Sequence, residues 1–204
     1  MRALVLGGTG FIGASVVPAL VARGVDVVTL GRSASADVVL DVLDPGAVEA
    51  YLRRETFDVV ANLAGAGLAT ESVGLSVMEQ VNAGLPARLL STLLERDEPP
   101  AFVHAASSTE RQGDDEPDES EYSRTKHEGA QAVRDLADRS PSPVVLLRIH
   151  NTYGPGQPRT RFVSGAIATL AEGRPIRLNY PDRVRDFVFL DDVAQAVAEV
   201  VVAP

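Results

Sequence analysis

The sequence predicts an α/β fold, a doubly wound parallel sheet with helices on both faces, followed by a smaller C-terminal part. Short aliphatic runs alternate with amphipathic stretches through the first 150 residues, and the first run leads directly into a glycine-rich turn. Alternation of this kind is typical of βαβ units, which place strands in parallel. After residue 150 the runs are shorter and Gly- and Pro-rich segments separate them. We therefore expect a sheet domain over residues 1–150 and a second region over 151–204.

Strands are predicted where aliphatic and β-branched residues form short runs between polar or glycine residues. These runs cover residues 4–6, 25–30, 38–40, 58–63, 101–105, 144–149 and 176–178, with a further apolar run at 184–190. Helices are predicted where apolar residues recur every three or four positions. They cover residues 11–23, 45–54, 76–96, 122–138, 162–172 and 191–202. Asp191 or Asp192 can cap the last helix.

The composition excludes several classes of protein and site. The net charge of −9 opposes nucleic-acid binding, because phosphate contacts need a basic face. The lack of Cys and the presence of only three scattered His predict neither a disulfide nor a metal site. No apolar run reaches the roughly 18 residues of a membrane span, and the first run reads as a strand rather than a leader. We therefore expect a cytoplasmic protein with no membrane partner.

The glycine-rich turn after the first strand is the first candidate binding site. A chain that turns tightly, admits a pyrophosphate to its backbone and then begins a helix has no room for side chains at these glycines. The helix N-terminus adds N–H donors and the positive end of its dipole. The turn predicts a Rossmann-type dinucleotide site, the alternative being a plain strand-to-helix turn. The residues of the predicted site are Gly7, Thr9, Gly10, Phe11, Ile12 and Gly13.

The end of the second strand indicates which dinucleotide binds. NAD-binding chains carry an acid there, which bonds the ribose hydroxyls and repels a 2′-phosphate. This chain has Gly31-Arg32 instead, and a guanidinium suits a phosphate. We therefore favour NADP over NAD, the alternative being that Arg32 is a solvated loop residue. Further cofactor contacts are expected after the third strand, where Asp41 and Val42 would meet the adenine. After the fourth strand, the segment Asn62-Leu63-Ala64-Gly65 would lie along the ribose side of the cofactor.

A Tyr and a Lys four residues apart form the candidate catalytic pair. Tyr122 and Lys126 share one face of the predicted helix, and Lys126 is the only Lys among 19 basic residues. A phenol has an ordinary pKa of about 10, and a neighbouring ammonium lowers that pKa toward neutral pH. The pair therefore predicts proton transfer by Tyr122, with Lys126 also able to reach the cofactor ribose. Coincidence is the alternative, and the scarcity of Lys argues against it.

Four ordered motifs, spread over the whole chain, resemble those of one known family. They are the glycine turn, Tyr122-Ser123-Arg124-Thr125-Lys126, the segment Leu147-Arg148-Ile149-His150-Asn151-Thr152-Tyr153-Gly154-Pro155-Gly156, and the segment Arg185-Asp186-Phe187-Val188-Phe189-Leu190-Asp191-Asp192-Val193. Together they are similar to the extended short-chain dehydrogenase/reductase family, in its NAD-dependent epimerase/dehydratase branch. The resemblance implies an enzyme that uses NAD or NADP and acts on a nucleotide sugar.

The resemblance also implies a third catalytic hydroxyl after the fifth strand. By alignment to the family motif this residue is Ser108, with Ser107 or Thr109 as possible substitutes. It would hydrogen-bond the substrate oxygen while Tyr122 passes a proton. In the 4,6-dehydratases of this branch an Asp-Glu pair follows the catalytic Thr, and this chain has Thr109-Glu110 there, which we expect to face the substrate. The missing Asp argues against a dehydratase, because elimination needs an added acid.

Three further positions match residues of the family that lie near the substrate. Asn151 matches the position that contacts the sugar nucleotide, and Arg185 matches an Arg that grips its diphosphate. An ion pair of Arg185 with Asp186 or Asp192 is the alternative. Asn82 matches a position near the active site.

Two features depart from the pattern of the family. Ser108 and Tyr122 are only 14 positions apart (122 − 108), and Gln112-Gly113 replaces the usual Tyr-Gly of the family. The sequence also stops at Pro204, where family members usually continue through a substrate-binding lobe. We therefore expect a complete cofactor site and a partial substrate-binding region over 151–204.

These features together predict an NADPH-dependent ketoreductase acting on a nucleotide-linked keto-deoxysugar. A net reductase draws on NADPH, whereas an epimerase recycles its own hydride. One alternative is a nucleotide-sugar epimerase with tightly held NAD. Another is a non-catalytic dinucleotide sensor or regulatory subunit, against which the Tyr–Lys pair argues. We expect a homodimer that pairs through the helices at 76–96 and 122–138.

Overall fold

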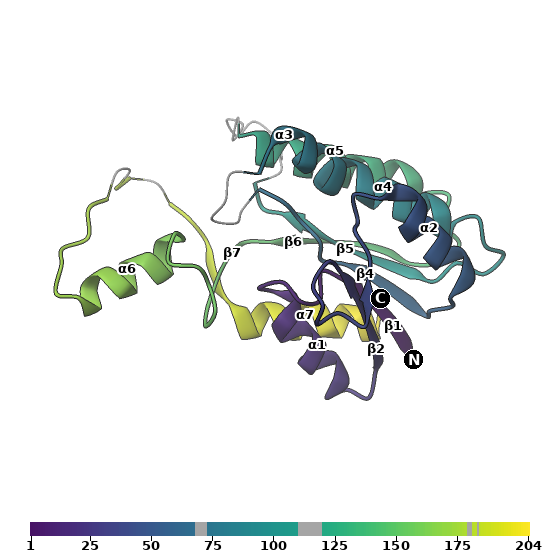
Figure 1. The fold of residues 1–204 in the computed structure, drawn as a ribbon, viewed down its shortest axis with the longest axis horizontal. Coiled ribbons are helices and arrows are strands. Elements are labelled where there is room, and N and C mark those ends of the chain that lie inside the picture. Colours follow the sequence, from purple (N-terminus) through teal and green to yellow (C-terminus); the bar gives the residue numbers. More distant parts are fainter. Residues whose placement is uncertain (68–72, 110–119, 179–180, 183) are drawn as a thin grey trace.

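A six-stranded parallel sheet forms the centre of the molecule (Figure 1). The computed structural model describes residues 1–67, 73–109, 120–178, 181–182 and 184–204. Across the sheet the strands follow the order β3-β2-β1-β4-β5-β6. Their bounds are β1 Arg2–Leu6, β2 Asp26–Gly31, β3 Val38–Val39, β4 Val59–Asn62, β5 Ala101–Ser107 and β6 Val144–Ile149. The predicted α/β fold is confirmed, and its strand order reverses between β1 and β4, where such folds bind ligands.

Helices cover both faces of this sheet. Helices α1 and α7 lie together on one face, and α2, α4 and α5 lie on the other with α3 and the π-helix η1 (Figure 1). The bounds of all helices are α1 Gly13–Val21, α2 Pro45–Arg54, α3 Leu75–Met78, η1 Glu79–Gly84, α4 Leu85–Leu93, α5 Glu121–Ala137, α6 Phe162–Ala171 and α7 Leu190–Val202.

Successive residues of each central strand face opposite helical layers. In β1, Ala3 and Val5 pack in the core shared with α1 and α7, whereas Leu4 and Leu6 pack in the core shared with α2 and α4. All four side chains are fully buried. Burying one Val or Leu side chain contributes about 1.5–3 kcal/mol, so both layers are held firmly on the sheet. Burial on both faces is also why the sequence reads as continuous aliphatic runs.

A second, two-stranded sheet lies beyond β6. Its strands are β7 Asn151–Tyr153 and β8 Phe187–Phe189, which pair in parallel. The predicted strand at residues 176–178 is wrong, because this segment has no backbone partner in a sheet and its two aliphatic side chains are exposed. The pairing partner of Asn151–Tyr153 is instead the apolar run near residue 188.

Helix α6 stands apart from the sheet on an arm that comprises residues 154–186 (Figure 1). It has no buried residue, and Phe162, Ile167 and Leu170 are each more than half exposed. Helix α7 returns from the arm to the sheet and packs on α1. The division of the chain at residue 150 stays a prediction, and α7 contributes to the core of the sheet from beyond it.

The helix predicted over residues 76–96 is interrupted. The π-helix η1 separates α3 from α4, and Asn82 lies fully buried within it. Turns of this kind occur often at functional sites. A Cβ built on Gly129 of α5 would lie only 1.9 Å from the Asn82 backbone oxygen. The glycine therefore allows α5 and η1 to approach this closely.

We expect Gly129→Ala to destabilise the fold, because the added methyl group overlaps the Asn82 carbonyl. Relief requires α5 to shift, and overpacking of this kind costs about 1–3 kcal/mol. Urea unfolding followed by circular dichroism measures the change. Gly46→Ala in α2 is the matched control, since the Cβ there would lie 3.7 Å from Asp44 Oδ1, an ordinary contact. Equal losses of stability in the two variants would contradict this explanation.

Candidate active site

The glycine turn after β1 is a backbone cradle with no space for side chains. Gly7 has a φ of +75°, and a Cβ on it would lie 2.9 Å from the Ala64 backbone nitrogen. A Cβ on Gly13 would lie 2.2 Å from the Gly7 carbonyl oxygen. The Gly10 N–H donates to that same oxygen at 3.0 Å, which closes the turn. The cradle fits a dinucleotide pyrophosphate, which needs close access to the backbone.

The other residues predicted for this turn lie between β1 and α1. Thr9 is exposed, and its Oγ1 faces Gly31 at the end of β2. Phe11 and Ile12 are partly exposed, and Ile12 takes the N-cap position of α1. The helix therefore begins at the turn, as the predicted anion site requires.

The residues after β2 place a basic side chain beside the cradle. Arg32 is exposed and forms no ion pair with any carboxylate in the part of the chain that the structure describes. Asp37, the only acid in the segment that joins β2 to β3, is bonded elsewhere. Its Oδ2 accepts from the Thr29 backbone N–H at 2.9 Å and from Thr29 Oγ1 at 2.7 Å. These bonds, the backbone one first, lower the pKa of Asp37.

The loop after β3 carries Asp41 and Val42. The Leu43 N–H donates to Asp41 Oδ1 at 3.0 Å, and the Asp44 N–H donates to the Asp41 carbonyl at 2.9 Å. Val42 is buried in the core beneath α2 and α4. The loop is therefore a tight turn at the carboxyl edge of the sheet, on the same side as the glycine cradle.

The loop after β4 contains Leu63, Ala64 and Gly65, and two buried amides hold it. Asn62 Oδ1 accepts from the Ala64 N–H at 3.1 Å. Asn82 Oδ1 accepts from the Ala66 N–H at 2.9 Å, and its Nδ2 donates to the Ala66 carbonyl at 3.0 Å. The same Nδ2 also donates to Thr125 Oγ1 at 3.1 Å. Asn82 thus connects this loop to α5.

Helix α5 carries Tyr122 and Lys126 at the carboxyl edge of the sheet. Ser120 caps the helix by accepting from the Ser123 N–H at 3.2 Å, so Tyr122 lies in its first turn. Lys126 is buried, and its Nζ donates to the Ala105 carbonyl of β5 at 2.5 Å. The Tyr122 ring lies beside Gly67, where an added Cβ would be 3.4 Å from Cδ2. The predicted pair is therefore oriented by contacts with β5 and with the loop after β4.

The hydroxyl residues after β5 differ in their surroundings. Ser107, the last residue of β5, is buried, and its Oγ lies 2.8 Å from Thr109 Oγ1. The Thr109 carbonyl accepts from Ser123 Oγ, next to Tyr122. Ser108 is partly exposed in the following turn, where its N–H donates to the Ile149 carbonyl at 3.1 Å. Glu110, predicted to face the substrate, lies outside the described residues.

A buried histidine lies beneath the candidate catalytic pair. His104 is fully buried, and its Nδ1 lies 3.3 Å from Asn62 Nδ2. The oxygen of that amide faces the Ala64 N–H, so Nδ2 donates and Nδ1 accepts. Burial, and then the Lys126 ammonium, hold the pKa of His104 well below its ordinary value. His104 is therefore neutral, and Lys126 supplies the positive charge.

The two residues predicted to bind the substrate lie at the base of the arm. Asn151 begins β7, and both its backbone N–H and its Nδ2 donate to the Asp186 carbonyl, at 3.2 and 3.3 Å. Arg185 is exposed and donates only to the Val184 carbonyl among the described contacts. Asp186 pairs with His150 at 3.3 Å rather than with Arg185. The described contacts connect neither Asn151 nor Arg185 to Tyr122.

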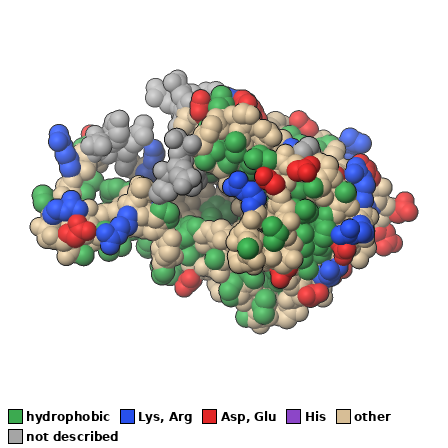
Figure 2. All heavy atoms as spheres, in the orientation of Figure 1, with side chains coloured by type: hydrophobic (Ala, Val, Ile, Leu, Met, Phe, Trp, Pro, Cys, Tyr) green, Lys and Arg blue, Asp and Glu red, His purple; other side chains and the backbone are tan. Residues whose placement is uncertain are grey.

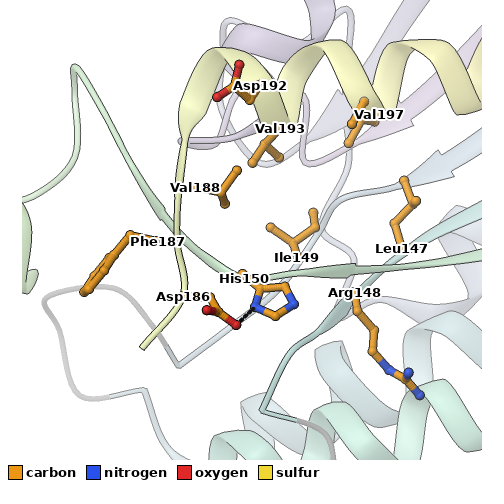
Figure 3. A pocket seen from close by; sticks show the side chains of 11 residues that line it. Leu147, Arg148, Ile149, His150, Asp186, Phe187, Val188, Asp192, Val193 and Val197 are labelled. Atoms are coloured by element: carbon orange, nitrogen blue, oxygen red, sulfur yellow. Dashed lines mark ion pairs between the residues drawn. The ribbon is translucent and has the colours of Figure 1, made fainter. Parts of the chain in front are cut away.

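Two hollows lie near this region. A pocket of about 370 Å³ between β6, β8 and α7 is lined mostly by aliphatic side chains, with the His150–Asp186 pair at its rim (Figure 3). A pocket of about 240 Å³ on the arm is lined by Arg159, Arg161 and Arg177. Figure 2 shows basic side chains gathered on this arm. The arm therefore offers an electropositive surface in a chain whose net charge is −9.

A cluster of metal ligands and a membrane-spanning helix are both absent from the described ranges. No group of three or more His, Asp or Glu residues there is placed to hold a metal ion. Of the helices in those ranges, none combines the length and apolar character needed to cross a bilayer.

The glycine turn after β1 and the Tyr122–Lys126 pair both lie at the carboxyl edge of the sheet. Residues 3–204 match the model of the NAD dependent epimerase/dehydratase family. The chain belongs to this family. Its relatives include dehydrogenases and epimerases, so this family member is an enzyme of the extended short-chain dehydrogenase type.

Two relatives are similar to this chain over most of its length. The dTDP-6-deoxy-L-talose 4-dehydrogenase (NAD(P)(+)) of Kitasatospora kifunensis is 32% identical over 222 residues, which cover 96% of this chain and 68% of that protein. UDP-glucuronate 4-epimerase 1 of Arabidopsis thaliana is 29% identical, over 94% of this chain and 53% of that protein.

The fold is also that of solved family structures. The UDP-glucose 4-epimerase of Thermus thermophilus, in complex with NAD, superposes with a TM-score of 0.75 at 26% identity. The match covers 100% of this chain and 75% of that one. The family and fold predictions are thereby confirmed.

Two supporting residues of this site, His104 and Thr125, were not predicted from the sequence. His104 Nδ1 faces the amide of Asn62, and Thr125 Oγ1 accepts from the amide of Asn82. His104 had a signal, since it is a polar residue inside an otherwise apolar run. Thr125 had none, because a Thr on a helix is ordinary until its partner Asn82 is located.

We expect His104 to make the fold less stable at acid pH. Its folded pKa lies below the ordinary value of about 6.5, so the unfolded chain binds a proton there first. Neutral His104 contributes fully to the stability of the fold above about pH 6.5, and this contribution is lost as the pH falls from about 6.5 toward the folded pKa. Over this window the free energy of unfolding should fall by up to about 1.4 kcal/mol per pH unit more steeply than in His104→Gln.

Urea titrations at several values between pH 7 and 5 measure this slope. Ser91→Ala, at an exposed residue of α4 without a titratable side chain, is the control and should keep the wild-type slope. Identical slopes in wild type and His104→Gln would show that His104 does not titrate as described.

Proposed function

We propose that this enzyme is an NADPH-dependent ketoreductase that acts on a nucleotide-linked keto-deoxysugar. The observation that carries the proposal is the environment of Arg32 after β2. No acid occupies the ribose position, and Asp37 is bonded to Thr29 instead of to Arg32. A guanidinium that no carboxylate in the described chain engages is suited to bind a 2′-phosphate. The relative from Kitasatospora kifunensis is named as using NAD(P)(+), which includes NADP as well as NAD.

The residues of this chain would divide the reduction among them. Bound NADPH supplies the hydride that reduces the ring ketone. Tyr122 donates its phenolic proton to the developing alkoxide oxygen, so that a hydride and a proton together yield the alcohol. The Lys126 ammonium stabilises the resulting phenolate and is held in place by the Ala105 carbonyl. Neutral His104 leaves that ammonium without a competing positive neighbour on β5.

We propose Ser107 rather than Ser108 as the hydroxyl that bonds the substrate oxygen. Ser107 is buried at the end of β5, two residues after the carbonyl that holds Lys126. Its Oγ joins Thr109, whose carbonyl accepts from Ser123 beside Tyr122. Ser108, which the family alignment favours, is partly exposed and has no described side-chain bond in this network.

The substrate class follows from charge and from relatives. The segment 151–189 has six Arg and three acidic residues in a chain of net charge −9, so its net charge is +3. An electropositive arm at the carboxyl edge of the sheet suits a diphosphate. The named substrates of the relatives are nucleotide sugars, and one relative is a 4-dehydrogenase of a dTDP-linked deoxysugar. The diphosphate would lie between Asn151 and Arg185.

The first test is titration of the protein with NADPH and with NADH, followed by nucleotide fluorescence. Wild type should bind NADPH more tightly, and Arg32→Ala should lose at least about tenfold for NADPH only, since one charge-assisted contact is removed. Arg139→Ala, at an exposed Arg that follows α5, is the control and should behave as wild type. An NADH preference untouched by Arg32→Ala would favour the epimerase with bound NAD.

The second test compares serine variants in NADPH-dependent reduction of a dTDP-4-keto-6-deoxysugar. We expect Ser107→Ala to lower kcat about 100-fold and Ser108→Ala to change it less than about threefold, because losing one positioned donor costs about 100-fold. Tyr122→Phe is the reference for loss of the proton donor, and NADPH affinity should be unchanged in all three variants. A larger loss in Ser108→Ala would assign the hydroxyl to Ser108. No turnover with any nucleotide sugar by wild type would favour a sensor.

A further inference from the structure

A partly buried guanidinium connects the loop after β3 to α4, the helix that follows η1. Arg88 lies on α4, and its Nη2 donates to the Val42 carbonyl at 3.1 Å. Its Nε donates to Glu49 Oε1 of α2 at 2.9 Å. The two side chains are only 29% and 12% exposed. This one side chain therefore joins α4 to α2 and to the loop that precedes α2, about 40 residues earlier in the sequence.

The Arg88–Val42 hydrogen bond positions the loop after β3 relative to α4, which the hydrogen bonds within the loop do not do. The Asp41 contacts to Leu43 and Asp44 shape the turn internally. Only the Arg88 contact, among those described for the Val42 carbonyl, sets the position of the turn against the rest of the site. Helix α4 continues directly from η1, which carries Asn82. The loops after β3 and after β4 are therefore both held by side chains of one continuous helical run, η1 and α4.

We propose that Arg88 is a positioning residue for the adenosine half of the dinucleotide. The inference rests on the proposed cofactor site, in which Asp41 and Val42 meet the adenine. Arg88 holds the Val42 backbone from behind and does not touch the cofactor. Glu49 orients the guanidinium, and Glu49 Oε2 is buried with no hydrogen-bond partner among the described residues. Among the described contacts, Arg88 is therefore the hydrogen-bond partner of the Glu49 carboxylate.

A matched control lies on the same pair of helices. Arg53 of α2 pairs with Glu95, just after α4, through bonds of 2.8 and 3.0 Å. This pair also ties α2 to the α4 region, and it is more than half exposed. It touches neither Val42 nor Asp41. Arg53→Met therefore removes an inter-helix ion pair without releasing the adenine loop.

The test separates the two halves of the cofactor. Arg88→Met alone leaves Glu49 buried without a partner, which threatens folding. Arg88→Met with Glu49→Met removes that charge, and urea unfolding verifies that the double variant is folded. Affinities are then measured by calorimetry for NADPH, for ADP-ribose, which lacks only the nicotinamide ring of the dinucleotide, and for reduced nicotinamide mononucleotide, which lacks the adenosine half.

We expect the double variant to bind NADPH and ADP-ribose about tenfold more weakly, a loss of about 1.4 kcal/mol. Reduced nicotinamide mononucleotide should bind as in wild type, and Arg53→Met should bind all three normally. Unchanged ADP-ribose affinity in the folded double variant, or an equal loss for both halves, would overturn the role of Arg88. Because NAD and NADP share ADP-ribose, a failed NADPH preference would not affect this result. Failure of wild type to bind any dinucleotide would overturn the cofactor site itself.

Discussion

The candidate active site depends on the hydrogen bonds of the buried Asn82 side chain. Its amide bonds both backbone groups of Ala66 and the Thr125 hydroxyl, while its backbone carbonyl lies against Gly129. A buried amide that loses a partner costs the desolvation of that atom, so these bonds are made or lost together. The loop after β4, the π-helix and α5 are thereby held in one arrangement.

The position of α5 in turn sets the chemistry at the carboxyl edge of the sheet. The same helix that lies against η1 at Gly129 carries Lys126, whose ammonium reaches the β5 backbone at Ala105. Beneath it, His104 is kept neutral by burial and by the ammonium, so a single positive charge remains in a region of low dielectric. Charge of this kind acts strongly on a neighbouring phenol because little solvent screens it.

On the side of the sheet where the cofactor is proposed to bind, two acidic side chains are bonded to neighbouring residues of the chain. Thr29 engages Asp37, which lies just before β3, and Arg88 engages Glu49 of α2. Arg32 is left without a carboxylate among the described contacts, and the arm beyond β7 carries a positive excess in an acidic chain. Global net charge therefore says little about which ligand charge this edge of the sheet favours.

The sequence by itself determined the sheet, its helical layers, the glycine cradle and the Tyr122–Lys126 pair, because these depend on local periodicity and on residues close together in the chain. It missed the π turn within residues 76–96 and placed a strand at 176–178, since both are decided by distant partners. Only the tertiary structure showed that Ser107, not its neighbour, is buried beside Thr109, and that Asn62, His104 and Arg88 support the site. The roles of Asn62, His104 and Arg88 depend on hydrogen bonds between residues more than 20 positions apart in the sequence. The burial of Ser107 depends on which side of the strand end the residue faces. No local sequence pattern encodes either property.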